Sequence, residues 1–190
     1  MAATQNETML AWVRKVFSAT RWRFACMSAL VGARHQSLAR LGDSGIERVL
    51  VVCYGNICRS AFVEAYFKRS PVPGVEVRSV GFHPVAGRTP PVRHIDLSRR
   101  HGIDLGSHRS RILSDSDLQW AQLIVLMDRH NWQALVKSGA DPTRLVWLGV
   151  LDGGATEIPD PYPMDGARAN AVVARLAACS AILARTLTAG

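Results

Sequence analysis

The segment with the clearest chemical potential covers residues 52–60 and reads Val-Cys-Tyr-Gly-Asn-Ile-Cys-Arg-Ser. In it Cys53 stands six residues before Arg59, which is the C-x5-R spacing. A cysteine thiolate is a strong nucleophile, and the planar guanidinium of an arginine can hold two oxygens of a phosphate at once. The pair therefore predicts attack by the sulfur of Cys53 on a bound phosphoryl group.

The residues around this pair are those that an anion-binding loop needs. The β-branched run Arg48–Cys53 predicts a buried strand, and a helical pattern begins at Ser60. Backbone N–H groups between a strand and a helix can converge on one point, where the helix N-terminus adds positive potential. Gly55 permits close backbone approach, and Asn56 tolerates the left-handed conformation that such a turn demands. We expect this field to favour the thiolate of Cys53. The alternative is a buried cysteine beside a surface arginine.

A second segment, residues 158–162, can supply the acid that phosphoryl transfer requires for its leaving oxygen. It reads Ile-Pro-Asp-Pro-Tyr, so Asp160 stands between two prolines that stiffen the loop and hold the carboxylate. Tyr162 follows two residues later, where its ring could line the mouth of a cleft. Because Asp-Pro turns are common, this segment taken alone suits an ordinary turn equally well.

The elements that must position these residues alternate between strand and helix. Apolar β-branched runs predict strands, and periodic or Ala-rich stretches predict helices. The predicted strands are residues 48–53, 75–80, 123–127 and 145–149. The predicted helices are residues 60–69, 92–101, 129–136 and 166–187. This alternation indicates an α/β fold, in which right-handed crossovers join the four strands of a parallel sheet.

Residues 1–46 precede this pattern and predict an N-terminal extension with a basic amphipathic helix. Apolar positions recur there at spacings of three and four, and basic residues flank them. The stripe consists of Leu10, Val13, Phe17, Thr20, Phe24, Met27 and Val31. Through residues 9–34 such a helix could contact an anionic membrane surface. It could also pack on the domain formed by residues 47–190, or the true start of the reading frame could lie near Met27.

Composition limits the class of protein. The chain has 190 residues, 48% of them hydrophobic and 20% charged, which is typical of a globular domain rather than a disordered or fibrous chain. Its longest charge-free apolar stretches are about half of the roughly 20 residues that a membrane-spanning helix needs, so we expect no integral membrane protein. Four cysteines without C-x-x-C or zinc spacing predict a cytoplasmic protein with no metal site. The net charge of +8 permits anionic partners.

Taken together, the two segments resemble the low-molecular-weight protein tyrosine phosphatases. The resemblance rests on residues 53–60 and 160–162 and covers the chain from about Arg48 to the C-terminus. Shorter stretches agree with it, namely residues 79–81, 101–105, 108–111 and 123–128. It implies a three-layer α/β sandwich with a four-stranded parallel sheet and a phosphate-binding loop after the first strand. It also implies a phosphatase catalytic domain over residues 47–190 that uses no cofactor.

The resemblance implies a role for individual residues. Cys53 matches the nucleophile that becomes a phosphocysteine, and Arg59 matches the phosphate-binding arginine. Asp160 matches the general acid, which afterwards activates water. Asn56 and His108 match a hydrogen-bonded pair that braces the loop, so His108 is expected to be structural. The residues implied to bind substrate are Tyr54, Gly55, Asn56, Ile57, Cys58, Ser60 and Tyr162.

Two of these loop residues have further implied roles. Ser60 matches the hydroxyl that eases departure of the thiolate from phosphorus. Cys58 matches a neighbour that can form a protective disulfide with the nucleophile under oxidation.

Relatives that share this loop hydrolyse phosphotyrosine or phosphoarginine, or reduce arsenate with thioredoxin. The phosphoarginine enzymes carry Thr at the position of Ile57. Arsenate reduction needs two further cysteines, and only Cys26 and Cys179 remain, one in the extension and one in the last predicted helix. Asp160 and Tyr162 also suit an aryl phosphate. The sequence therefore predicts a protein-tyrosine-phosphatase, with phosphoarginine phosphatase and arsenate reductase as alternatives.

The loop at residues 81–91 resembles the bacterial members associated with exopolysaccharide production. That likeness implies a tyrosine-phosphorylated protein as partner, such as a membrane tyrosine autokinase, and a location in the cytoplasm or at the inner face of the membrane. A remote alternative is a catalytically dead module that binds nucleic acid or lipid through its charge. The presence of Cys53, Arg59, Ser60 and Asp160 argues against that reading, so no specific nucleic acid partner is expected.

Overall fold

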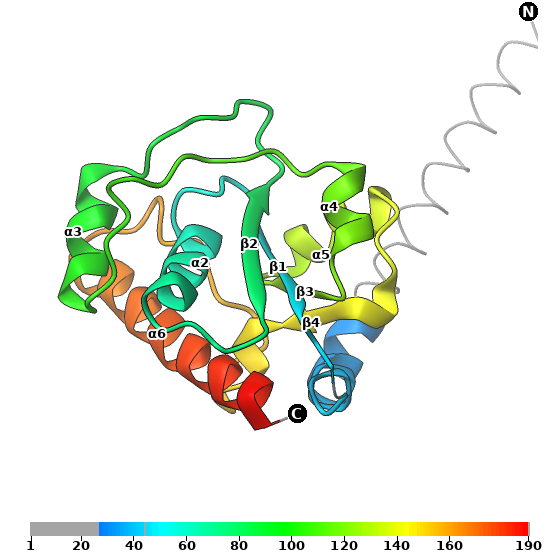
Figure 1. Ribbon diagram of the computed structural model, residues 1–190. Coiled ribbons are helices and arrows are strands. Elements are labelled where there is room, and N and C mark those ends of the chain that lie inside the picture. The colour runs from blue at the N-terminus through cyan, green and yellow to red at the C-terminus, as the bar shows by residue number, and fades with distance from the viewer. Residues whose placement is uncertain (1–26, 44, 190) are drawn as a thin grey trace, which may run out of the picture. The chain divides into compact units, whose positions relative to one another are not determined.

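The computed structural model describes residues 27–43 and 45–189 and shows a four-stranded parallel sheet (Figure 1). The strands lie in the order β2-β1-β3-β4. The first strand, β1, is therefore central, with β2 on one side of it and β3 and β4 on the other. The register pairs Val51 with Ser79 of β2 and with Val125 of β3. The strands are β1 (Arg48–Cys53), β2 (Glu76–Gly81), β3 (Leu123–Leu126) and β4 (Leu145–Trp147). The predicted α/β fold is confirmed.

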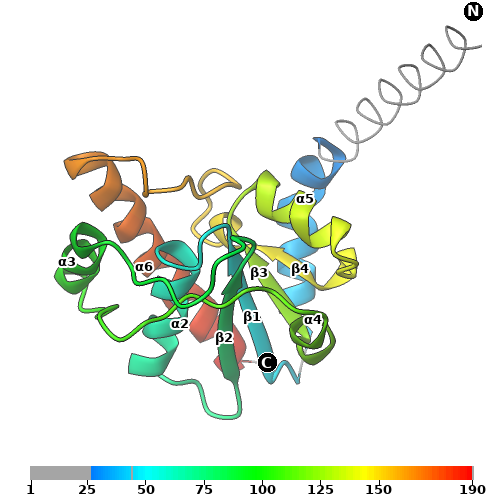
Figure 2. The ribbon, with the colours of Figure 1, turned by 90° about the horizontal axis from the view of Figure 1, so that it is seen from above.

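Helices cover both faces of the sheet, which gives the three predicted layers (Figure 2). Three of them, α2, α3 and α6, lie on one side, and α4 and α5 lie on the other. Their bounds are α2 (Arg59–Arg69), α3 (Val92–Arg100), α4 (Asp115–Trp120), α5 (Arg129–Lys137) and α6 (Gly166–Ala189). Short 3-10 turns occur at Pro142–Arg144 and Leu148–Val150.

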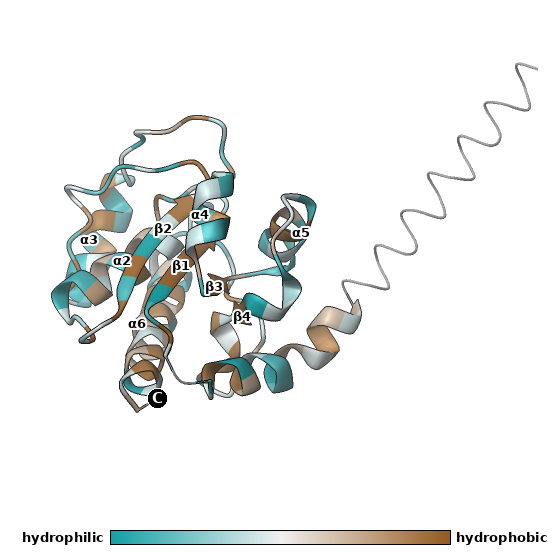
Figure 3. Ribbon diagram, turned by 45° about the vertical axis from the view of Figure 1, so that its right-hand side comes forward, coloured by the Kyte–Doolittle hydropathy of each residue, from teal (hydrophilic) through white to brown (hydrophobic). Residues whose placement is uncertain are grey.

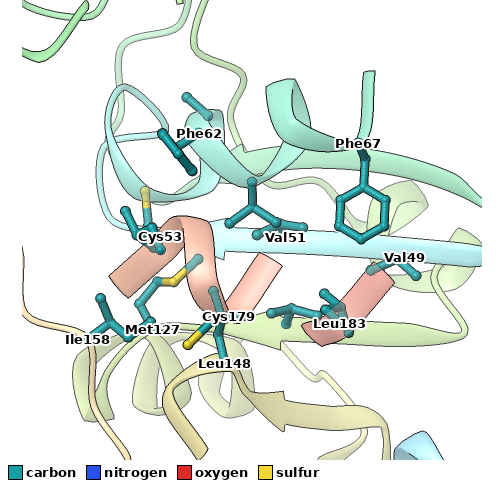
Figure 4. Packing of buried hydrophobic residues seen from close by; sticks show 14 of the residues in the cluster. Val49, Val51, Cys53, Phe62, Phe67, Met127, Leu148, Ile158, Cys179 and Leu183 are labelled. Atoms are coloured by element: carbon teal, nitrogen blue, oxygen red, sulfur yellow. The ribbon is translucent and has the colours of Figure 1, made fainter. Parts of the chain in front are cut away.

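The core lies between the central strands and the helices. Every residue of β3 is fully buried, and Figure 3 shows the central strands as apolar segments between helices with hydrophilic outer faces. Alternate residues of β1 point toward α2 and α6, so Val49, Val51 and Cys53 belong to the same cluster as Phe62 and Leu183 (Figure 4). Burying each such large apolar side chain contributes about 1.5–3 kcal/mol. Cys53 is therefore anchored at the end of a strand whose last five residues are buried.

The last helix, α6, is long and apolar enough to cross a membrane by length and composition alone. In this fold its apolar side chains pack against α2 and the sheet instead. The buried ones include Val173, Leu176, Cys179 and Leu183. These contacts identify α6 as a core helix of the domain.

Part of the predicted extension packs with the domain. Residues 33–190 form one compact unit, and residues 27–41 are helical. Ala33 and Leu41 are buried, and the buried hydroxyl of Ser37 accepts a 3.0 Å hydrogen bond from the backbone N–H of Trp147 in β4. Residues 33–43 and 45–46 therefore belong with the domain that was predicted to begin at residue 47. Residues 1–26, which hold most of the predicted amphipathic helix, lie outside the described residues.

Two elements differ from the prediction. Helix α4 was not predicted, although Ser114 and Asp117 form a capping box in which each side chain accepts a hydrogen bond from the other residue's backbone N–H. The strand predicted at residues 145–149 ends at Trp147. The chain then enters a 3-10 turn in which a Cβ on Gly149 would meet the backbone oxygen of Thr156 at 2.4 Å, so only glycine fits there.

Candidate active site

The loop between β1 and α2 carries the predicted nucleophile. Cys53 ends β1, and its side chain is buried. Its sulfur accepts a 3.2 Å hydrogen bond from the backbone N–H of Asn56 and lies 3.0 Å from the hydroxyl oxygen of Ser60. Both groups can donate a hydrogen bond to sulfur, so the loop holds this atom in a fixed position.

Asn56 provides the internal bracing of the loop. Its φ of 50° lies in the left-handed region, as the sequence predicted. Its buried side-chain N–H₂ donates to the hydroxyl groups of Ser60 (2.9 Å) and Ser79 (2.7 Å). Its side-chain oxygen accepts from the backbone N–H of Arg111 (2.7 Å). Gly81 permits this arrangement, because a Cβ there would meet the backbone nitrogen of Asn56 at 2.9 Å.

His108 supports the same loop from outside. Its Nε2 lies 2.7 Å from the backbone oxygen of Asn56, so this nitrogen carries the proton and donates. Its Nδ1 lies 3.8 Å from a carboxylate oxygen of Glu64. Burial lowers the pKa of His108, which favours the neutral ring. The predicted hydrogen bond between His108 and Asn56 is therefore present, with the backbone of Asn56 as the acceptor.

Arg59 begins α2 and lies with its side chain almost fully buried. Its Nη1 donates to a carboxylate oxygen of Asp128 at 2.5 Å and to the backbone oxygen of Ile158 at 3.0 Å. Its Nη2 lies 3.4 Å from a carboxylate oxygen of Asp160. Burial alone would lower the pKa of Arg59, but the negative charges of Cys53, Asp160 and Asp128 raise it. Its Nε is buried and has no partner among residues 27–43 and 45–189.

Asp128 was not predicted as a site residue. It directly follows the apolar run of β3, so it lies at the carboxyl edge of the sheet, as does the loop after β1. Ligand sites in open α/β sheets lie at this edge. An acid immediately after a buried strand is therefore the signal that could have identified it.

Asp160 reaches the site from the loop before α6. Its carboxylate accepts a 3.1 Å hydrogen bond from the backbone N–H of Tyr162, and its side chain is 40% exposed. The loop is fixed upstream, where the N–H of Ile158 donates to the backbone oxygen of Met127 at 2.8 Å. Arg175 of α6 donates to the backbone oxygen of Glu157 at 2.9 Å. The predicted acid and the predicted nucleophile therefore meet, although about 100 residues separate them.

A cavity of about 240 Å³ opens where these segments converge. Its lining residues are Cys53, Tyr54, Gly55, Ile57, Cys58, His83, Arg88, Asp160 and Tyr162. Four predicted residues do not line the cavity, namely Asn56, Arg59, Ser60 and His108. They support the loop that forms its wall through the contacts given above. The sequence missed His83 and Arg88, both of which belong to the loop after β2.

Two thiols, those of Cys53 and Cys58, line the cavity. Among the described residues, no group of three or more His, Cys, Asp or Glu side chains could hold a metal ion. Burial, followed by the charge of Cys53, raises the pKa of the neighbouring Cys58 thiol, which keeps it protonated.

Comparison with known proteins assigns the fold and this loop to a family. The profile described as low molecular weight phosphotyrosine protein phosphatase matches residues 48–189. The chain is 36% identical over 118 residues to the probable low molecular weight protein-tyrosine-phosphatase EpsP of Ralstonia nicotianae, covering 62% of this chain and 79% of EpsP.

Solved structures agree with this assignment. The tyrosine phosphatase Wzb from Escherichia coli K30, in complex with sulphate, is 25% identical with a TM-score of 0.68, over 75% of this chain and 99% of Wzb. The YwlE arginine phosphatase from Geobacillus stearothermophilus is 26% identical with a TM-score of 0.68, over 75% of this chain and 94% of YwlE. Since the family profile spans most of the sequence, the chain belongs to the low molecular weight phosphotyrosine protein phosphatase family.

Proposed function

We propose that the protein hydrolyses phosphotyrosine in proteins through a phosphocysteine intermediate on Cys53. The observation that carries this proposal is the buried, unpartnered Nε of Arg59 in the same loop as the buried Cys53. An unsatisfied buried donor costs about 1–3 kcal/mol, and a bound phosphate oxygen would recover that cost. The N–H groups of the loop would hold the other phosphate oxygens.

In the first step the thiolate of Cys53 attacks phosphorus. The S–P bond forms as the bond between phosphorus and the phenolic oxygen breaks, and the electron pair leaves with that oxygen. Protonated Asp160 gives its proton to the departing oxygen, so tyrosine leaves as a neutral phenol. Asp160 can reach the leaving oxygen while it also contacts Arg59, because its side chain lines the same cavity as Cys53.

In the second step water attacks the phosphocysteine. The carboxylate of Asp160 takes a proton from that water, the S–P bond breaks, and inorganic phosphate leaves. The hydroxyl of Ser60, 3.0 Å from the sulfur, stabilises the departing thiolate. Arg59 stabilises the charge on the equatorial oxygens in both steps. No cofactor takes part in this scheme.

The test is hydrolysis of p-nitrophenyl phosphate and of a phosphotyrosine peptide without added metal. Cys53→Ser should abolish turnover, and Asp160→Asn should lower kcat by about 100-fold or more, the usual size of a general acid's contribution. Asp165→Asn, an exposed acid of the same region, is the matched control for Asp160 and should keep full activity. Turnover by Cys53→Ser at the wild-type rate would contradict the covalent mechanism.

Phosphoarginine is the second candidate substrate, because the chain is also 35% identical over 117 residues to the protein-arginine-phosphatase of Geobacillus stearothermophilus. The apolar side chain of Ile57 lines the cavity, which supports a planar aryl group over a charged guanidinium. A phosphoarginine peptide belongs in the same assay, and kcat/KM for it should fall below that for phosphotyrosine. The reverse order would transfer the assignment to phosphoarginine.

Arsenate reduction is disfavoured by the position of Cys179. This thiol lies fully buried in α6, and burial raises its pKa to about 11. A relay of disulfides needs exposed thiols that form thiolates near neutral pH. Among the described residues, Cys179 is the one cysteine outside the Cys53 loop.

We infer further that the substrate is a tyrosine-phosphorylated protein of exopolysaccharide assembly, such as a membrane tyrosine autokinase. We also infer that the phosphatase works in the cytoplasm at the membrane surface. Similarity to EpsP and Wzb and the loop at residues 81–91 support this proposal. The full chain and a variant lacking residues 1–26 should be compared for binding to anionic vesicles. That truncation keeps Ala33 and Leu41, which belong to the core. Equal binding by both proteins would remove the membrane role.

A further inference from the structure

Arg88 is a fixed cation at the edge of the candidate site. It lines the same cavity as Cys53. Its backbone N–H donates to the hydroxyl of Ser110 at 3.0 Å, and its backbone oxygen accepts from the N–H of Ser110 at 2.9 Å. Its Nη2 donates to the backbone oxygen of Gly55 in the phosphate loop at 2.6 Å. Both ends of this residue are therefore held in place before any substrate arrives.

The guanidinium of Arg88 has unused donors. Its Nε is buried and has no partner in the part of the chain that the structure describes, as is also true of the Nε of Arg59 in the phosphate loop. None of the ion pairs within that part involves Arg88. By contrast Arg99, away from the cavity, pairs with Asp96 (3.5 Å) and Asp104 (3.1 Å). Arg88 thus presents an uncompensated positive charge next to the place where the phosphate would bind.

Arg93 adds a second such charge beside another lining residue. Its guanidinium lies 5.7 Å from the ring centre of Tyr162, and its Nη2 donates to the backbone oxygen of Tyr162. Within residues 27–43 and 45–189 it forms no ion pair with a carboxylate. Asp160, the acid that lines the cavity, faces Arg59 instead, as does Asp128. Arg88 and Arg93 therefore keep positive charges that no ion pair among the described residues neutralises.

From this geometry we propose that Arg88 and Arg93 form a recognition rim for carboxylates, which selects phosphotyrosine flanked by Asp or Glu. This inference rests on the proposed function and specifies the class of peptide that the same site takes. A carboxylate one or two residues from phosphotyrosine would accept from the half-buried Arg88 guanidinium that lines the cavity, while the phosphate is held by Arg59. Preorganisation adds to selectivity, because Arg88 loses little side-chain freedom on binding.

The experiment compares two phosphotyrosine peptides that differ only in having Glu or Gln at the flanking positions. The wild-type protein should show a kcat/KM about three- to tenfold higher for the Glu peptide, the range expected of partly exposed charge-assisted contacts. Arg88→Gln and Arg93→Gln should each lower this ratio toward one. Arg100→Gln, an exposed arginine at the other end of the same helix as Arg93, is the matched control and should keep the ratio.

The ratio of the two peptides isolates recognition from catalysis. Arg88→Gln also removes the hydrogen bond to Gly55, and any resulting loss of kcat affects both peptides equally. Arg88→Lys keeps the charge and should retain part of the preference. Raising the salt concentration should weaken the wild-type preference, because exposed charges are screened. Equal kcat/KM for the two peptides in the wild type, or an unchanged ratio in both glutamine variants, would overturn the proposal.

Binding separates this proposal from the proposed function. The affinity of the Cys53→Ser variant for each peptide can be measured by calorimetry without any turnover. Failure of the wild type to hydrolyse any aryl phosphate would contradict the proposed function. A preference of the Cys53→Ser variant for the Glu peptide would still support the rim, and equal affinities would sink it.

Discussion

The two halves of the candidate site are built in different ways. The phosphate loop, residues 53–60, joins a buried strand to a helix, and side chains from other segments, such as Ser79, His108 and Asp128, brace it. The acid loop, residues 158–162, is partly exposed, and its carboxylate accepts one backbone hydrogen bond, from Tyr162, while it faces Arg59. The nucleophile is thus fixed by the fold, whereas the acid is positioned by a loop that Arg59 and Arg175 hold.

This difference follows from what each group must do. A thiolate needs a convergent set of donors that does not relax, because reorganisation at the moment of reaction would raise the barrier. A general acid must exchange protons with a leaving group and later with water, so partial exposure suits it. The comparison predicts that changes in the phosphate loop affect stability and activity together, and that changes around the acid loop affect mainly activity.

The largest effect is expected for Asn56→Ala. This change removes the side-chain contacts with Ser60, Ser79 and Arg111 and leaves an alanine at a φ of 50°. We expect a loss of about 2–4 kcal/mol in the free energy of unfolding and a fall of about 100-fold in kcat/KM. Denaturant melts and aryl phosphate kinetics measure both quantities. If activity falls while stability stays at the wild-type value, the loop is not the fixed element described here.

Asp128→Asn should have the next largest effect. The carboxylate of Asp128 holds Nη1 of Arg59 at 2.5 Å, so the amide would leave the buried guanidinium with a weaker partner and shift its position. We expect kcat/KM to fall about 10- to 100-fold, since small displacements of a positioned group are costly. Asp141→Asn, an exposed acid that caps the 3-10 turn Pro142–Arg144, is the control. A wild-type kcat/KM for Asp128→Asn would show that Ile158 and Asp160 hold Arg59 without help from Asp128.

The phosphate loop could be predicted from sequence because its signals are local. Consecutive residues supply the strand, the left-handed turn and the helix start, so Cys53, Asn56 and Arg59 carry their geometry with them. The α/β fold was predictable for a similar reason, since apolar runs and periodic stretches alternate. Helix α4 escaped because it has only six residues and follows no long apolar pattern, and its capping box was the one local signal.

The contacts that join distant segments could not be predicted in this way. Asp128 and Arg88 reach the site only because β3 and the loop after β2 end at the same edge of the sheet as β1. Nothing near Arg88 in the sequence shows that Ser110 and Gly55 will hold it. Likewise the packing of Ser37 against β4 depends on strand order, and residues 33–46 were therefore assigned to the extension. Tertiary pairing decides these positions.

Arg175→Met tests the second half of the comparison. The guanidinium of Arg175 pairs with Asp152 at 2.7 Å and donates to the backbone oxygens of Gly149 (2.7 Å) and Glu157 (2.9 Å). Its loss should loosen the segment that leads to Asp160 while the phosphate loop stays intact. We expect kcat to fall about three- to tenfold, with less than a twofold change in the inhibition constant of inorganic phosphate. A larger change in phosphate binding than in kcat would show that the two loops are coupled.

The smallest effect is a dependence of stability on pH that both halves share. Burial lowers the pKa of His108 at the phosphate loop, and burial followed by the charge of Arg93 lowers that of His94, whose ring stacks on Tyr162 at the acid loop. A histidine with a lowered folded pKa binds more protons when unfolded, so its contribution is complete above the unfolded pKa of 6.5. Stability should therefore fall as the pH drops below about 6.5.

Single variants can divide this fall between the two regions. His108→Gln and His94→Phe should each reduce the slope of the free energy of unfolding against pH between pH 7 and 5. Because Gln can still donate to the backbone oxygen of Asn56, His108→Gln should keep most of its activity at pH 7. His94→Phe keeps a ring stacked on Tyr162. A change in its melting curve with pH therefore reports the loss of the titrating group at position 94 and not a loss of packing. Slopes equal to that of the wild type in both variants would place the acid-sensitive groups outside the two loops.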